Sequence, residues 1–161
     1  MKNFHIEKGF ELDGRTVDLL YQGDTYWMDN GTEETAIHQK VADRCSGKVL
    51  VGGLGLGVVV QQLLQNKDVA HIVVVEKEQA VVDLIRDTLP LEDSRLEIIV
   101  QGIWPYILST EERFDYVYLD IVPVATIKSY ATISLPLKIG AERVAPSSNI
   151  ICYEEVKGID V

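Results

Sequence analysis

Residues 48–76 read KVLVGGLGLGVVVQQLLQNKDVAHIVVVE, and this stretch decides the fold. The apolar run at 49–51 leads into a cluster of glycines, then into a segment long enough for a helix, and then into a β-branched run that ends on Glu76. This order predicts a strand, a tight turn, a helix and a second strand. Glycine suits such a turn, because a chain that reverses from strand into helix needs either a positive φ or a close approach of its backbone to a ligand.

The spacing of the glycines, Gly52, Gly53, Gly55 and Gly57, indicates which ligand the turn binds. A dinucleotide site has the pattern G-x-G-x-x-G, whereas the third glycine here comes one residue early and gives G-x-G-x-G. Glu76 lies 19 residues after Gly57, where a nucleotide-binding βαβ unit carries the carboxylate that binds a ribose. We therefore expect a nucleoside ligand other than NAD. The alternative is a turn that only tightens the junction between strand and helix.

Over these residues the chain resembles the class I S-adenosylmethionine-dependent methyltransferases, and in particular the spermidine synthase-like branch of that superfamily. In that branch a strand reading VLVIGGGDGG precedes a helix, and the second strand ends in VVE. The resemblance implies that S-adenosylmethionine or a relative of it lies over Gly53, Gly55 and Gly57. It also implies that Glu76 binds the ribose hydroxyls.

Strands and helices alternate along the rest of the chain, which predicts an α/β fold with a doubly wound, parallel, Rossmann-like sheet. Right-handed crossovers favour the strand order 3-2-1-4-5. The expected strands are 49–51, 72–75, 96–100, 114–119 and 149–153, and the expected helices are 32–44, a segment from 58, 78–90 and 134–144. The sheet is expected to be truncated after strand five. This strand would then be an exposed edge, and we expect a homodimer.

Residues 1–30 alternate in the manner of short strands, with turn signals at Asp13-Gly14 and Gly23-Asp24. They predict a short antiparallel β meander with strands at 4–12, 16–21 and 25–28. The Rossmann-like core would follow at 31–161. At 161 residues the whole chain has the length of a single domain.

The composition is that of a globular protein with an acidic surface. Hydrophobic residues make up 47% of the chain, and its net charge is −10. Nucleic acid is an unfavourable partner for such a chain, because phosphate backbones are bound by clustered Lys and Arg. We expect a small-molecule substrate that is neutral or cationic. No apolar run reaches the ~18 residues of a membrane span and no signal peptide is recognisable, so we expect no membrane partner and a cytoplasmic location.

Several candidate site residues follow the ends of the expected strands. Ligands of parallel sheets bind at this edge, beside the point where the strand order reverses. Glu76 ends the second strand, Gly102 and Ile103 follow the third, and Asp120 follows the fourth. The resemblance implies that Gly102 and Ile103 lie at the adenine, with Trp104 either stacked on it or in the core. It implies that Asp120 is the catalytic residue, acting as a base or as an electrostatic partner; the alternative is an Asp that caps the next segment.

The chain departs from the spermidine synthases at polar positions of their site. Leu56 replaces an Asp of the glycine loop, Ile103 replaces the Asp of a GDA motif, and the second acid of a DxxDP motif is missing after Asp120. A buried ammonium group needs counter-charges. We therefore expect methyl transfer to a small molecule, which requires mainly that a nucleophile be aligned with the methyl group. The alternatives are a degenerate, non-catalytic nucleoside-binding or interaction domain, and an aminopropyltransferase.

Two residues before the glycine loop are candidates for the substrate site. The helix expected at 32–44 resembles the DExxYHE segment of polyamine synthases, in which Glu33 and Glu34 match the acidic pair and His38 matches the histidine. Trp27 precedes this helix and is a candidate for a lid. A structural histidine and the packed face of a hairpin are the respective alternatives. The sequence has no HExxH or CxxC motif, so it predicts no metal site.

Overall fold

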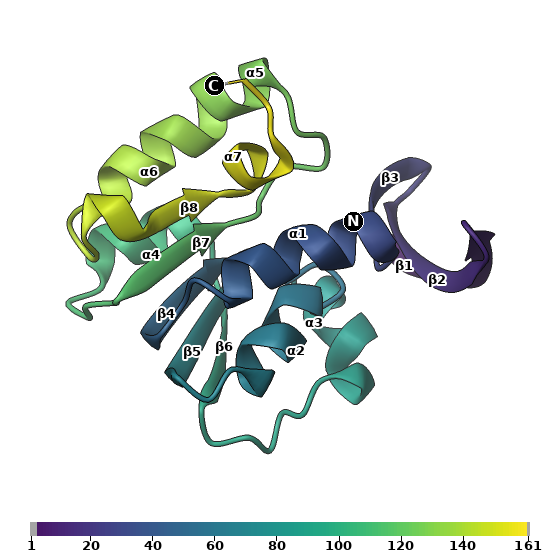
Figure 1. Cartoon of the computed structure of the whole chain (residues 1–161), viewed down its shortest axis with the longest axis horizontal. Helices are drawn as coiled ribbons and strands as arrows, with labels where there is room; N and C mark the ends of the chain where they lie inside the picture. The colour runs from purple at the N-terminus through teal and green to yellow at the C-terminus, as the bar shows by residue number, and fades with distance from the viewer. Residues whose placement is uncertain (1–2, 161) are drawn as a thin grey trace.

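The computed structural model of the protein describes residues 3–160 (Figure 1). The expected meander at 1–30 and core at 31–161 therefore reach beyond the described residues at Met1, Lys2 and Val161. Within the described part, a parallel sheet has the strand order β6-β5-β4-β7-β8. These strands are β4 (Gly47–Gly52), β5 (Val69–Glu76), β6 (Leu96–Val100), β7 (Tyr116–Leu119) and β8 (Ile150–Cys152). In chain order this is 3-2-1-4-5, so the predicted topology is confirmed.

The strands carry apolar side chains on both faces, because helices cover both faces of the sheet (Figure 1). Along β4 and β5, Val49 and Val74 pack in one core cluster, whereas Leu50 and Val73 pack in the other. The first cluster lies under α1 (Thr32–Ala42), α2 (Val58–Gln65) and α3 (Gln79–Ile85). The second lies under α4 (Ile103–Ser109) and α6 (Leu135–Ala141). The alternation along each strand thus sets which helix it contacts.

Several helices differ from the sequence-based expectation. The helix expected at 78–90 ends at Ile85 and continues as a 3₁₀ turn, Arg86–Thr88. The helix expected at 134–144 begins earlier, as α5 (Ile127–Ser129) and a π-helical turn (Tyr130–Ser134) that precede α6. The sequence-based expectation did not include α4, whose first turn contains Pro105 at a position where proline is tolerated. No helix in the described part of the chain is long and apolar enough to cross a membrane.

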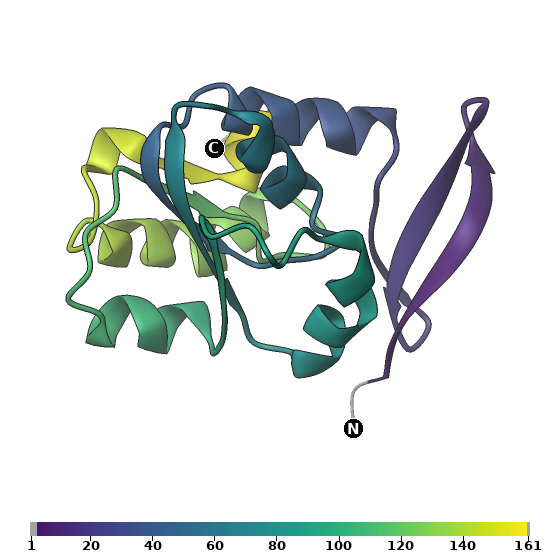
Figure 2. The ribbon, with the colours of Figure 1, turned by 90° about the horizontal axis from the view of Figure 1, so that it is seen from below.

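Segments near both ends of the described chain pack into the core. The fifth strand stops at Cys152, because Tyr153 begins α7 (Tyr153–Lys157). The prediction that this strand extends to Tyr153 is wrong. The predicted meander is confirmed as an antiparallel sheet of β1 (Phe4–Leu12), β2 (Arg15–Gln22) and β3 (Thr25–Asp29). It lies to the side of the parallel sheet (Figure 2) and joins the core through Phe4 and Leu20. The expected homodimer stays a prediction, with β8 at one edge of the sheet.

The glycine loop between β4 and α2 lies against the end of β7. Gly53 has a φ of +94°, and a Cβ at this position would lie 2.0 Å from the backbone oxygen of Asp120. A side chain at residue 53 would therefore push apart the loop and the segment that carries Asp120. The glycine is required here by the protein's own backbone as well as by any ligand.

We expect Gly53→Ala to lower the free energy of unfolding by about 2–4 kcal/mol, because it adds steric overlap to backbone strain. Gly14→Ala is the matched control: its φ is +75°, but no atom lies within 4 Å of the added Cβ. That variant should lose only about 1 kcal/mol. Urea unfolding of both variants measures the difference, and equal losses would contradict the close approach of Gly53 to β7.

Candidate active site

A cavity of about 590 Å³ lies at the carboxyl ends of the central strands. This volume is typical of a small-molecule site. The predicted residues that line it are Gly53, Gly55, Glu76, Gly102, Ile103, Asp120 and Trp27. The prediction that these residues lie together at one edge of the sheet is therefore correct. Gly57 and His38 do not line the cavity: a Cβ at Gly57 would lie 2.8 Å from Leu89, and His38 is buried behind Asp120.

Glu76 fixes the path of the backbone on both sides of the cavity. Its Oε2 accepts a hydrogen bond from the Leu54 N–H and its Oε1 accepts one from the Glu78 N–H, each at 2.9 Å. The side chain is buried, yet it lines the cavity. Because a carboxylate oxygen accepts more than one hydrogen bond, Glu76 retains capacity for a ligand hydroxyl.

The meander supplies one wall of the cavity. Met28 Sδ accepts a hydrogen bond from the Leu56 N–H at 3.3 Å, and a Cβ at Gly55 would lie 2.2 Å from this sulfur. Trp27 lines the cavity and packs edge-on against Phe4. Its indole Nε1 is buried without a hydrogen-bond partner among the described residues. Trp27 is thus both a packed residue of the meander and a wall of the cavity.

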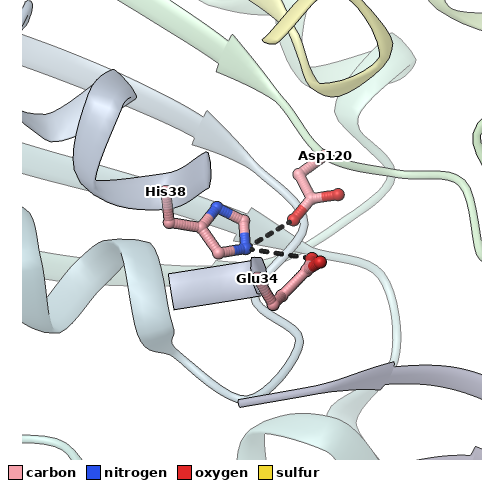
Figure 3. A group of neighbouring side chains, drawn as sticks. All are labelled: Glu34, His38 and Asp120. Carbon is pink, nitrogen blue, oxygen red and sulfur yellow. Dashed lines mark ion pairs between the residues drawn. The ribbon is translucent and has the colours of Figure 1, made fainter. Parts of the chain in front are cut away.

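An acidic cluster lies at the side of the cavity beneath β7 and α1. His38 Nε2 lies 3.4 Å from Glu34 Oε1 and 3.6 Å from Asp120 Oδ2, and it points between the two carboxylates (Figure 3). His38 Nδ1 shares a 3.2 Å hydrogen bond with the Tyr118 hydroxyl. The Tyr153 hydroxyl donates to Glu34 Oε2 at 2.7 Å. Segments far apart in the sequence, namely α1, the end of β7 and α7, therefore meet in this cluster.

The surroundings of this cluster disfavour negative charge. Burial raises the pKa of Asp120 to about 6, an effect that His38 reduces and Glu34 increases. Burial also raises the pKa of Tyr118 and of Tyr153, so both phenols are neutral at physiological pH. The cluster is thus electrostatically suited to receive a cation.

Two positions that differ from the spermidine synthases lie in different surroundings. Leu56 is buried in the hydrophobic core and does not line the cavity. Ile103 lines the cavity beside Trp104, whose side chain is 43% exposed and packs against Gly140. Trp104 is therefore a cavity residue, and its placement in the core is wrong. Tyr153 also lines the cavity, which the sequence missed because its segment read as the end of a strand.

We expect Glu76→Ala to lower the free energy of unfolding by about 2 kcal/mol, because two backbone N–H groups lose their acceptors. Glu76→Gln keeps one acceptor oxygen and should lose less. Urea unfolding distinguishes the two variants, with Glu92→Ala, an exposed glutamate, as the control. An alanine variant as stable as the control would mean that Glu76 does not hold the loop. Glu76→Gln is then the variant of choice for testing ribose binding.

No protein-family model matches the chain. Among curated proteins it is similar to polyamine aminopropyltransferases. It is 27% identical to polyamine aminopropyltransferase 2 of Hyperthermus butylicus over 124 residues, which cover 73% of this chain and 39% of that protein. It is 25% identical to the polyamine aminopropyltransferase of Saccharolobus solfataricus over 132 residues, which cover 76% of this chain and 42% of that protein. The chain thus spans about two fifths of the length of these relatives.

Solved structures of the same fold include a spermidine synthase from Thermotoga maritima, with a TM-score of 0.58 and 16% identity over 86% of this chain and 53% of that one. A putative RNA methyltransferase from Pyrococcus horikoshii matches with a TM-score of 0.50 and 16% identity over 70% of this chain and 52% of that one. The resemblance to the spermidine synthase-like branch is therefore confirmed. Because the curated relatives are aminopropyltransferases, the comparisons favour that alternative over the methyl transfer expected from the sequence.

Proposed function

We propose that the cavity is the site of an aminopropyltransferase, which moves the aminopropyl group of decarboxylated S-adenosylmethionine to a small amine. The observation that carries this proposal is the acidic cluster of Glu34 and Asp120 at the cavity wall. Both the donor and a protonated amine acceptor are cations. The similarity to polyamine aminopropyltransferases supports the same conclusion.

The charge of the cavity distinguishes the two possible donors. Four carboxyl side chains and two lysines line the cavity, namely Glu34, Glu76, Glu78, Asp120, Lys77 and Lys157. S-adenosylmethionine would bring its own carboxylate into this acidic lining. The decarboxylated donor lacks that group and carries only the sulfonium and the ammonium. Electrostatic repulsion therefore favours the decarboxylated donor.

The donor would be held by the residues that line the glycine-loop side of the cavity. Glu76 would accept hydrogen bonds from the ribose hydroxyls, since its oxygens retain acceptor capacity. Ile103 and Trp104 would contact the adenine, replacing a polar contact with apolar packing. The sulfonium would then face Asp120 across the loop. Binding of the donor on this side therefore does not require the acid that Ile103 replaces.

The transfer reaction forms a C–N bond, breaks a C–S bond and releases a proton. The amine nitrogen attacks the methylene carbon bonded to sulfur, the new C–N bond forms as the C–S bond breaks, and the electron pair returns to sulfur as a neutral thioether. The proton lost from the amine passes to Asp120. Glu34, held by the Tyr153 hydroxyl, supplies the second carboxylate beside the amine. It takes the place of the counter-charge that is missing at Leu56, which is buried in the core.

The experiment that tests the proposal compares donors. Incubation with decarboxylated S-adenosylmethionine and putrescine should yield methylthioadenosine and an aminopropylated amine, both quantified by mass spectrometry. S-adenosylmethionine with the same amine should yield no S-adenosylhomocysteine. Methyl transfer in the second reaction, without product in the first, would refute the proposal. Absence of product in both, with either donor still raising the melting temperature, would favour the non-catalytic alternative.

We expect Asp120→Asn to lower kcat by about 10²–10⁴-fold, because the amide cannot accept the proton. The KM for the donor should change less than kcat, since the contacts proposed for the donor's ribose and adenine do not involve Asp120. Steady-state kinetics measure both constants. The control is Asp87→Asn, which removes an exposed carboxylate away from the cavity and should leave both unchanged. A full kcat in the Asp120 variant would rule out its role as the base.

A further inference from the structure

The cluster of Glu34, His38 and Asp120 has a second possible occupant. Glu34 and His38 lie on α1, and Asp120 directly follows β7. His38 and Asp120 are 82 residues apart in the sequence. One potential ligand atom from each lies within 4.8 Å of the others (Figure 3). We propose that these residues form a binding site for a first-row divalent metal ion.

The distances in the cluster fit metal coordination better than direct pairing. His38 Nε2 lies 3.4 Å and 3.6 Å from the nearest oxygens of Glu34 and Asp120, whereas a charge-assisted hydrogen bond is about 2.7–2.9 Å long. Nitrogen and oxygen ligands lie about 2.0–2.2 Å from such an ion, so two of them at a tetrahedral angle are roughly 3.4 Å apart. An ion would therefore fit the present distances of His38 from both carboxylates, and the two carboxylate oxygens, which lie within 4.8 Å of each other, would lie about 3.4 Å apart around it.

The imidazole nitrogen that faces the carboxylates lies within ion-pairing distance of both but makes no hydrogen bond to any described residue. His38 is 1% exposed, and its Nε2 has no hydrogen-bond partner anywhere in residues 3–160. A buried polar atom without a partner is destabilising, because it has lost its hydrogen bonds to water and gained none in return. A metal ion would remove this penalty by taking the lone pair of Nε2. This unpartnered nitrogen is the observation, independent of the carboxylates, that points to a ligand.

The residues behind the cluster would hold the ligands in place. The Tyr118 hydroxyl lies 3.2 Å from Nδ1, the ring nitrogen that faces away from the carboxylates, and its oxygen can accept a hydrogen bond from Nδ1–H. In that tautomer Nε2 carries the lone pair. Tyr153 donates to the Glu34 oxygen that does not face His38. Metal-binding histidines and carboxylates in proteins are typically oriented by such outer hydrogen bonds.

The three ligand groups indicate which ions the site can bind, and the position of the cavity indicates the route by which an ion enters. One imidazole and two carboxylates suit Mn²⁺, Fe²⁺ or Zn²⁺, whereas Ca²⁺ prefers oxygen ligands alone and Cu⁺ prefers sulfur. Glu34 and Asp120 line the cavity, and His38 does not. An ion would therefore enter from the cavity and keep open positions on that side.

This site does not depend on the proposed transfer reaction, but the two affect each other. The ion would occupy the same two carboxylates that the amine needs. We therefore expect the ion and the amine to exclude one another, and the metal-bound protein to be inactive in transfer.

Titration of the metal-free protein with Mn²⁺, followed by the electron paramagnetic resonance signal of free Mn²⁺, tests the proposal. We expect one ion bound per chain, displaced by Zn²⁺. His38→Gln and Glu34→Gln should each weaken binding by at least about tenfold. The control is His71→Gln, because His71 also lies 3.6 Å from a carboxylate, that of Glu97, but at an exposed pair without a third ligand. Its Mn²⁺ affinity should equal that of the unchanged protein.

Two results would overturn the proposal: no loss of free Mn²⁺ with the folded, unchanged protein at millimolar ion, or equal affinity in Glu34→Gln and the control. Circular dichroism checks that each variant is folded. If His38→Gln does not fold, Glu34→Gln and Tyr153→Phe decide the question, since both side chains line the cavity. The titration contains no donor and no amine, so its failure leaves the transfer proposal untouched, and failure of transfer leaves this one untouched.

Discussion

The close approach of Gly53 to the backbone oxygen of Asp120 is the constraint on which the cavity depends. It joins the loop after β4 to the end of β7, so that the part of the cavity suited to an adenosyl group and the part that carries the acids have a fixed separation. Glu76 adds a second restraint from β5, because its carboxylate holds the loop at Leu54. The three neighbouring strands β4, β5 and β7 thus set the positions of the side chains that line the cavity. They also set where the helices that follow them begin.

Negative charge is concentrated in one part of this cavity against an unfavourable environment. Burial raises the pKa of Asp120, and Glu34 raises it further, although His38 lies between them. Such an arrangement is retained in proteins mainly where a function requires it. Whether the cation that relieves it is an ammonium group or a metal ion, the physical cause is the same: two carboxylates share a small, largely buried volume with one imidazole. Competition between the two kinds of cation follows from this shared volume.

Only some of the acids expected from the polyamine synthase motifs are present in the cavity: Glu34 and Asp120 are retained, whereas Leu56 and Ile103 replace acids of the relatives. Judged by these motifs, the chain has lost counter-charges for an amine, because Leu56 stands at an acidic position and the second acid of the DxxDP motif is missing after Asp120. In the folded protein Leu56 is buried in the core, and α1 brings Glu34 beside Asp120. A motif records which positions carry charge in relatives. The charge of a cavity is a sum over every segment that reaches it, and here a helix outside the nucleotide-binding unit contributes to that sum.

The sequence by itself determined the parallel sheet, its strand order, the meander and the edge of the sheet at which the cavity lies, because β-branched runs buried on both faces and a glycine turn have local signatures. It did not determine α4, the start of α7 at Tyr153, or the environment of His38. A helix boundary depends on small differences in packing, and the partners of His38 are contributed by Tyr118 and Asp120, about eighty residues away. Only the tertiary structure decided that these groups meet, since no local pattern encodes the contact between α1 and the end of β7.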